Sequence, residues 1–142
     1  MITAYIDGGA RGNPGPAGYG VRIEDAGGTL IEELHGALGI ATNNVAEYNG
    51  LLAALTWAAA RGERALHVRS DSLLLVNQMR GEFKVKHPGL QPLYARARLL
   101  AAQLDRVTFE HIRRELNTEA DRLSNVAMDK AEAEAAARLK AE

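Results

Sequence analysis

The sequence predicts an α/β domain built on a five-stranded mixed sheet with helices on both faces. Two observations lead to this fold class. Residues 2–38 alternate apolar and polar side chains in three runs separated by glycine- and proline-rich turns, whereas from residue 45 the apolar side chains recur at helical spacing. Strand and helix patterns then follow one another to the end. A strand reached through a helix should lie parallel to one of the three antiparallel strands. At 142 residues the chain is most simply one domain.

The first three strands form an antiparallel meander. Asp7 ends the first strand, whose β-forming residues read ITAYI. The turn at 12–16 (GNPGP) leads into the second strand, where Tyr19, Val21 and Ile23 alternate with polar or small residues. A Gly-Gly pair at 27–28 predicts a tight hairpin. The predicted strands cover residues 2–6, 19–24 and 29–38.

The remaining elements alternate between helix and strand. Asn44 is expected to cap the first long helix, with Glu47 three residues later, and Asn117 to open the last one. The last helix should turn Ala120, Leu123, Ser124 and Ala127 inward. The full set in this half is a helix from residue 45, a strand at 65–70, a short helix at 72–80, an irregular basic stretch at 82–88, a helix at 90–104, a strand at 107–111 and the last helix.

Composition excludes several classes of function. The chain has no cysteine, so disulfides, thiolate zinc sites and cysteine nucleophiles are ruled out. No apolar run approaches the roughly 20 residues of a membrane span, and the N-terminus lacks a signal-peptide pattern. We therefore expect a cytoplasmic protein with no membrane partner. The net charge is −1, but residues 61–114 carry 11 Lys/Arg against 5 Asp/Glu, a local excess compatible with a nucleic-acid partner or with an uneven solvated surface.

Four acids lie at element ends that the predicted topology brings together. Asp7 and Asp71 each end a strand, and ligands of α/β sheets gather at the carboxyl ends of strands. Glu47 and Asp121 lie near the starts of two helices. Each acid has a simpler interpretation: Glu47 could complete a capping box with Asn44, Asp121 could complement a helix dipole, and the two strand-end aspartates could be turn residues. Together they favour a cleft that needs cations. All-oxygen ligands favour Mg²⁺ or Mn²⁺, and two such ions suit phosphoryl transfer.

Four segments together resemble the type 1 ribonuclease H family, in its compact bacterial and archaeal subgroup. They are YIDGGARGNPGPAGYG, TNNVAEYNGLLAAL, VRSDSLLLVNQM and NTEADRLSNVA, in that order. The resemblance covers residues 1–128, which it implies are a ribonuclease H-like catalytic domain. Residues 129–142 are then an Ala/Glu/Lys-rich helical tail.

The resemblance implies an endoribonuclease that hydrolyses the RNA strand of RNA/DNA hybrids with two metal ions, Mg²⁺ or Mn²⁺, leaving 5′-phosphate and 3′-hydroxyl ends. We expect a monomer that binds an RNA/DNA hybrid, and no obligate protein partner is evident from the sequence. The family's metal-ligating acids match Asp7, Glu47, Asp71 and Asp121. The implied substrate-binding residues are Gly8, Gly9, Arg11, Gly12, Asn13, Thr42, Asn43, Asn44, Lys86 and His87. Within this set, backbone at the glycines would meet 2′-hydroxyls, and Thr42 would bind a phosphate of the DNA strand.

The sequence departs from the family pattern at several positions. Leu73 replaces a polar minor-groove residue, His87 stands where a DNA-phosphate-binding Asn is often found, and the basic helix-loop insertion is missing. No histidine matches the mobile one before the last acid. Arg114 is expected to serve there as an electrostatic catalytic group, unless it is a surface arginine paired with Glu110 or Glu115.

Two other functions remain open from the sequence. One is a non-catalytic hybrid- or duplex-binding module on the same fold, since a fold does not fix a function. The other is a different metal-dependent nuclease of the same superfold, such as a junction resolvase or a transposase-like enzyme.

Overall fold

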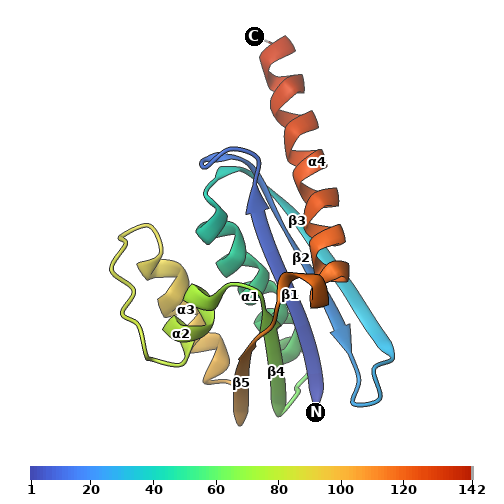
Figure 1. Cartoon of the computed structure of the whole chain (residues 1–142), viewed down its shortest axis with the longest axis vertical. Helices are drawn as coiled ribbons and strands as arrows, with labels where there is room; N and C mark the ends of the chain where they lie inside the picture. Colours follow the sequence, from blue (N-terminus) through green and yellow to red (C-terminus); the bar gives the residue numbers. More distant parts are fainter. Residues whose placement is uncertain (142) are drawn as a thin grey trace.

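The computed structural model describes residues 1–141 and shows a five-stranded sheet in the order β3-β2-β1-β4-β5 (Figure 1). The β1–β2 and β2–β3 pairs are antiparallel, and the β1–β4 and β4–β5 pairs are parallel. This confirms the predicted mixed sheet. The strands are β1 (Ile2–Ala10), β2 (Gly15–Glu24), β3 (Leu30–Ala41), β4 (Ala65–Ser70) and β5 (Arg106–His111).

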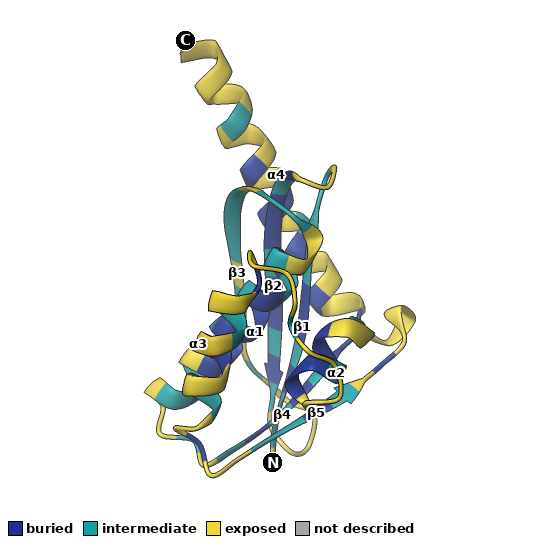
Figure 2. Cartoon of the chain, turned by 90° about the vertical axis from the view of Figure 1, so that its left-hand side faces the viewer, coloured by how far each residue is buried: buried dark blue, intermediate teal, exposed yellow. Residues whose placement is uncertain are grey.

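Helices cover both faces of the sheet, with α1, α2 and α3 on one side and α4 on the other (Figures 1 and 2). The helices are α1 (Asn43–Ala60), α2 (Leu73–Met79), α3 (Gln91–Ala101) and α4 (Thr118–Ala141), and a single 3₁₀ turn, η1 (Arg114–Leu116), precedes α4. Among residues 1–141, no helix is both long and apolar enough to cross a membrane.

The main core lies between the sheet and α1. Because side chains alternate across a strand, Ala4 and Ile6 of β1 point to the same face as Val21 of β2, while Asp7 points to the opposite face. Ala4, Ile6 and Val21 are fully buried, as are Leu51 and Leu55 of α1. Burying such side chains stabilises the fold by roughly 1.5–3 kcal/mol each. This packing fixes the first long helix against the strand that carries Asp7.

On the other face, α4 lies directly against β2 because two strand positions lack side chains. A Cβ atom at Gly20 would lie 2.4 Å from the carbonyl oxygen of Ala120, and one at Gly18 would lie 2.5 Å from Cβ of Ala127. The predicted inner stripe of this helix, Ala120, Leu123, Ser124 and Ala127, is buried. The last turns of α4 project beyond the sheet (Figure 1) and are largely exposed (Figure 2).

The structure corrects the predicted position of Asp7. Pairing with β2 extends β1 to Ala10, so Asp7 lies inside the strand and not at its end. The parallel pairing of β1 with β4, however, stops at Ile6 and Ser70. Asp7 and Asp71 therefore follow the last paired residues of two neighbouring strands, which is the juxtaposition that the topology argument required.

The helix caps also differ from expectation. The N-cap of α1 is Thr42, whose side chain accepts a hydrogen bond from the Val45 amide, and Asn44 lies inside the helix. Asn117 lies just before α4, and its carbonyl accepts from the Asp121 amide. Its side chain, however, turns into the protein and donates to the carbonyl of Ile6 over 2.8 Å. Because both Thr and Asn are good cap residues, the sequence did not distinguish Thr42 from Asn44.

Candidate active site

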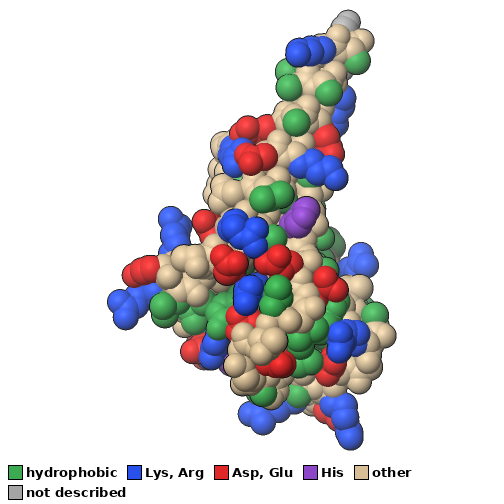
Figure 3. Space-filling view, turned by 90° about the vertical axis from the view of Figure 1, so that its right-hand side faces the viewer, with side chains coloured by type: hydrophobic (Ala, Val, Ile, Leu, Met, Phe, Trp, Pro, Cys, Tyr) green, Lys and Arg blue, Asp and Glu red, His purple; other side chains and the backbone are tan. Residues whose placement is uncertain are grey.

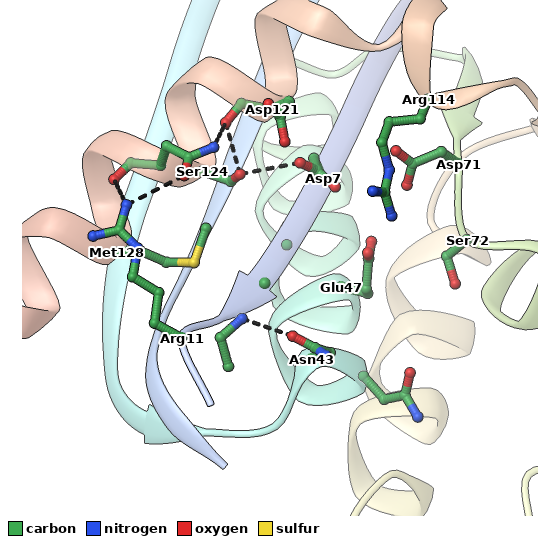
Figure 4. Close-up of a pocket in the computed structure, with 15 residues that line it drawn as sticks. Asp7, Arg11, Asn43, Glu47, Asp71, Ser72, Arg114, Asp121, Ser124 and Met128 are labelled. Atoms are coloured by element: carbon green, nitrogen blue, oxygen red, sulfur yellow. Dashed lines mark hydrogen bonds between the residues drawn. The ribbon is translucent and has the colours of Figure 1, made fainter. Parts of the chain in front are cut away.

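A cleft of about 460 Å³ opens where β1 and β4 stop pairing (Figure 4). Asp7 enters it from β1, Asp71 follows β4, Glu47 comes from α1 and Asp121 from the first turn of α4. Arg114 of η1 lines it as well. Four elements that are distant in sequence thus deliver the predicted acids to one place.

Three of these acids form a tight group. Carboxylate oxygens of Asp7, Glu47 and Asp71 lie within 4.8 Å of one another, close enough to share a cation. Asp121 lines the same cleft but is exposed and lies outside this group. The fourth predicted ligand is therefore at the rim of the cleft, where α4 begins.

Burial and mutual repulsion raise the pKa of Asp7 to about 7. Desolvation is the largest cause and the charge of Asp71 is the next. A hydrogen bond from Ser124 to the carboxylate, 3.0 Å from Oγ to Oδ2, opposes the rise. Without a cation, Asp7 is thus close to half-protonated at neutral pH. A bound cation would reverse this tendency, because it favours the ionised carboxylates.

Glu47 shows the same need for a positive partner. Desolvation raises its pKa well above the usual range, and the charges of Asp7 and Asp71 add to the effect. Its Oε2 atom is buried and has no hydrogen-bond partner among the described residues. Unsatisfied buried oxygens are rare in native proteins and call for an explanation such as an ion. This oxygen, together with the all-carboxylate donor set, fits a hard divalent cation.

Arg114 is directed toward this acidic group. Its side chain reaches toward Asp71 and Glu47 (Figure 4), and its charge lowers the pKa values of both, against the larger effect of desolvation. The alternative pairing with Glu110 is not what the structure shows, because Glu110 is bound by His67 over 2.7 Å and by Arg69 over 2.9 Å. The Arg114 side chain is exposed and is available to an anion in the cleft.

Two polar residues beneath the cleft were not predicted to support the acids. Ser124 was expected only on the inner face of the last helix, and Asn117 only at its start. The Asn117 side chain is buried, donates to the carbonyl of Ile6 and lowers the pKa of Asp71, against the larger effect of desolvation. Ser124 follows Asp121 by three positions, so helical spacing could have indicated it. No sequence signal marked the inward turn of Asn117.

The structure gives an internal reason for one glycine of the Gly-rich segment. A Cβ atom at Gly8 would lie 2.3 Å from the carbonyl carbon of Ala46, so Gly8 lets α1 lie against β1. Gly8 and Gly9 line the cleft. Gly12 has a φ of +92°, the left-handed conformation that favours glycine, where the chain turns toward β2. The segment is thus explained first by packing and turn geometry.

Asn43 and Asn13 brace the neighbouring loops. The Asn43 side chain accepts a hydrogen bond from the Ala10 amide over 2.8 Å, and the Asn43 amide donates to the side chain of Asn13 over 3.1 Å. These contacts join the end of β1, the turn after it and the start of α1. Asn43 also lines the cleft, as does Asn44.

A second hollow of about 670 Å³ adjoins this region and brings together Asn13, Thr42, Asn44 and His87. The Thr42 hydroxyl is used as an acceptor for the α1 cap but can still donate. Nδ1 of His87 accepts from the Gly89 amide over 3.0 Å. Lys86 is exposed next to His87 and does not line the hollow. The structure therefore places Thr42 and His87, the two residues at predicted DNA-phosphate positions, in a hollow of their own, and Asn44 lines both this hollow and the acidic cleft.

Comparison with protein-family models gives a match over residues 5–127 to the family described as reverse transcriptase-like. A bifunctional protein of Mycobacterium tuberculosis is 52% identical over 137 residues, covering 96% of this chain and 38% of that protein. Ribonuclease HI of Halobacterium salinarum is 40% identical over 130 residues, covering 92% of this chain and 65% of that enzyme. The chain thus spans less than two thirds of the length of these curated relatives.

Solved structures of related proteins have the same fold. The N-terminal RNase H domain of the mycobacterial protein matches with a TM-score of 0.89 at 49% identity, covering 95% of this chain and 99% of that chain. RNase H1 of Halobacterium salinarum matches with a TM-score of 0.87 at 40% identity, covering 91% of this chain and 98% of that chain. LC11-RNase H1, solved in complex with an RNA/DNA hybrid, matches with a TM-score of 0.88 at 44% identity, covering 92% and 99%.

Proposed function

This chain belongs to the reverse transcriptase-like family and, within it, to the type 1 ribonucleases H, and from this premise we propose that it hydrolyses the RNA strand of RNA/DNA hybrids. The observation that carries the proposal is the group of carboxylate oxygens from Asp7, Glu47 and Asp71 within 4.8 Å of one another. A group of this kind, in an open cleft with an arginine beside it, suits phosphodiester hydrolysis and no chemistry that needs a cysteine or histidine nucleophile.

The acids are proposed to hold two divalent cations, Mg²⁺ or Mn²⁺. When bound, two such ions would supply a water made more nucleophilic and a positive charge at the leaving 3′-oxygen, chemistry that would leave 5′-phosphate and 3′-hydroxyl ends. Asp7, Glu47 and Asp71 supply the inner oxygens, and the exposed Asp121 closes the cleft at its rim. The unpartnered Oε2 of Glu47 supports this assignment, since an oxygen without a hydrogen-bond donor is free to contact an ion.

Other residues are proposed to orient the substrate. Arg114 donates hydrogen bonds to an oxygen of the scissile phosphate, and its positive charge stabilises the negative charge that develops in the transition state. Backbone groups of the Gly8–Gly12 segment, part of which lines the cleft, meet the 2′-hydroxyls that distinguish RNA from DNA. The separate hollow with Thr42 and His87 takes a phosphate of the DNA strand. Monomeric action in the cytoplasm stays a prediction.

End-labelled RNA/DNA, DNA/DNA and RNA/RNA duplexes, each incubated with Mg²⁺, Mn²⁺ or EDTA, test the proposal. We expect cleavage of the RNA strand of the hybrid alone, with either metal ion and not with EDTA. Binding of the hybrid without cleavage would identify a non-catalytic module. Cleavage of DNA/DNA substrates would indicate another nuclease of this superfold.

A further inference from the structure

Arg11 lines the cleft, but its guanidinium group is already bound by acidic side chains. It is the first residue after β1, and its side chain turns toward α4 (Figure 4). One terminal nitrogen, Nη1, lies 2.5 Å from Oδ1 of Asp129 and 3.2 Å from Oε2 of Glu132. The other, Nη2, lies 3.2 Å from the side-chain oxygen and 3.4 Å from the carbonyl oxygen of Asn125. Both ends of the guanidinium fork are thus occupied by the same helix.

This contact is continuous with the candidate active site. The side-chain amide of Asn125 donates to the carbonyl oxygen of Asp121 over 2.9 Å, and Asp121 lines the cleft. Asp129 and Glu132 follow Asn125 by about one and two turns on the same helix. The helix that supplies the rim acid therefore also supplies the acids that hold Arg11.

The carboxylates that bind Arg11 resemble the phosphate that this residue is expected to contact in a substrate. A guanidinium binds carboxylate and phosphate oxygens with the same planar geometry, so the two compete for the same N–H groups. The three side chains remain accessible to solvent and to a ligand: Arg11 is 32% exposed, Asp129 69% and Glu132 47%. Acidic and basic side chains are interspersed along this face of the molecule (Figure 3). Exposed ion pairs of this kind contribute little to stability, so they can exchange partners.

We propose that Asp129 and Glu132 restrain nucleic-acid binding by occupying Arg11, which a phosphate of the hybrid can engage only by displacing them. This inference rests on the proposed function, because it names residues that limit how tightly the same cleft binds its RNA/DNA substrate. The two acids lower affinity in two ways: they neutralise a cation at the cleft and place negative charge where the nucleic acid enters. The chemical step is unaffected, because it depends on Asp7, Glu47 and Asp71.

The test uses steady-state cleavage of a short RNA/DNA hybrid and anisotropy of a labelled hybrid, both at several salt concentrations. We expect Asp129→Asn/Glu132→Gln to lower KM and Kd by about 3–10-fold at ~50 mM salt with kcat unchanged, the gain expected of one added hydrogen bond to a phosphate. The slope of log affinity against log salt should become more negative by about 0.9. Glu134→Gln removes a charge from the same helix at an exposed position and is the matched control. It should change KM much less.

The same double substitution in an Arg11→Ala background separates release of Arg11 from general repulsion. We expect most of the gain to disappear there. An equal gain in that background would overturn the proposal, because the acids would then act without Arg11. An unchanged KM in the original background would also overturn it, and so would a higher KM, which would mean that the acids orient Arg11 for binding. Wild-type cleavage with unresponsive variants refutes this inference alone, whereas a wild-type chain that does not cleave the hybrid refutes the proposed function.

Discussion

The hydroxyl of Ser124 lies 3.0 Å from Oδ2 of Asp7, joining the last helix to the first strand across 117 positions of sequence. The same hydroxyl lies 2.8 Å from the carbonyl oxygen of Asp121, so it can donate to either acceptor. Gly20 makes this contact possible, because it pairs with Asp7 across the β1–β2 ladder and leaves room for α4 above the strand. A buried serine thus links a buried acid of the cleft, Asp7, to the helix that carries the rim acid, Asp121.

Replacing Ser124 by alanine should shift the acid limb of the pH–activity profile to higher pH. The hydrogen bond from Ser124 lowers the pKa of Asp7, so its loss should raise a value that already stands at about 7. A hydrogen bond to a charged group is worth roughly 1.5–3 kcal/mol, which corresponds to about 1–2 pH units. The acid limb of the kcat/KM profile should therefore move upward by about 1 pH unit at low metal concentration. Val126→Ala on the exposed side of α4 is the control, and an unmoved profile for Ser124→Ala would contradict the assignment.

Asp7→Asn should abolish cleavage yet stabilise the metal-free protein. The folded-state pKa of Asp7 is about 7 against an ordinary 3.8, so protonation favours the native state. The stability that this group contributes is full below pH ~4 and is lost as the pH rises to ~7. In EDTA, urea unfolding should show the variant to be more stable than wild type by on the order of 4 kcal/mol at pH ~8, with little difference at pH ~4. Saturating Mg²⁺ should reduce the difference. A variant that is less stable at the higher pH would contradict the repulsion argument.

Gly20→Ala should damage the site from a distance. The added Cβ would lie 2.4 Å from the Ala120 carbonyl oxygen and 2.6 Å from the Ser124 amide nitrogen, so α4 has to shift. Overpacking of this kind costs about 1–3 kcal/mol, and the shift should weaken the contact between Ser124 and Asp7. We expect a lower melting temperature together with reduced kcat. Gly27→Ala, in a turn where the nearest atom to the new Cβ is 3.5 Å away, should change neither.

Arg114→Ala should lower kcat by roughly 10–1000-fold, the range for a lost transition-state donor, with metal affinity nearly intact. Arg114→Lys should recover only part of the activity, because a point charge does not replace the planar fork. Arg113→Ala is the matched control, since Arg113 is adjacent, exposed and does not line the cleft. Steady-state kinetics on a short hybrid decide between them. A wild-type rate for Arg114→Ala would mean that Arg114 is a surface arginine without a catalytic role.

The fold was predictable because its elements have strong local signals. Alternation identified the meander, and the change to helical spacing identified α1. The convergence of the acids was predicted from two strand ends that face one cleft if the strands are parallel neighbours, together with two helix starts. Asp121 shows the limit of that argument: topology placed it in the cleft, but it did not show that this acid stays outside the tight group of three.

Arg11 and Asn117 show which contacts the sequence did not reveal. The resemblance made Arg11 a substrate contact, whereas its position against Asp129 and Glu132 depends on the length and direction of α4. Asn117 is a good helix cap by type, and its inward turn toward Ile6 is set by tertiary packing. Local patterns do not encode which of several possible partners a polar side chain meets once distant elements come together.

The most direct test of the central claim is mass spectrometry of the products formed from an RNA/DNA hybrid in ¹⁸O-labelled water with Mg²⁺. If the Asp7, Glu47 and Asp71 group directs water onto the phosphate, each cut should place one ¹⁸O atom in a 5′-phosphate and leave an unmodified 3′-hydroxyl. An identically prepared Asp7→Asn sample should give no products above background. A 2′,3′-cyclic phosphate, or cleavage at an undiminished rate by the variant, would contradict the account, because the cut would then not depend on water directed by these carboxylates.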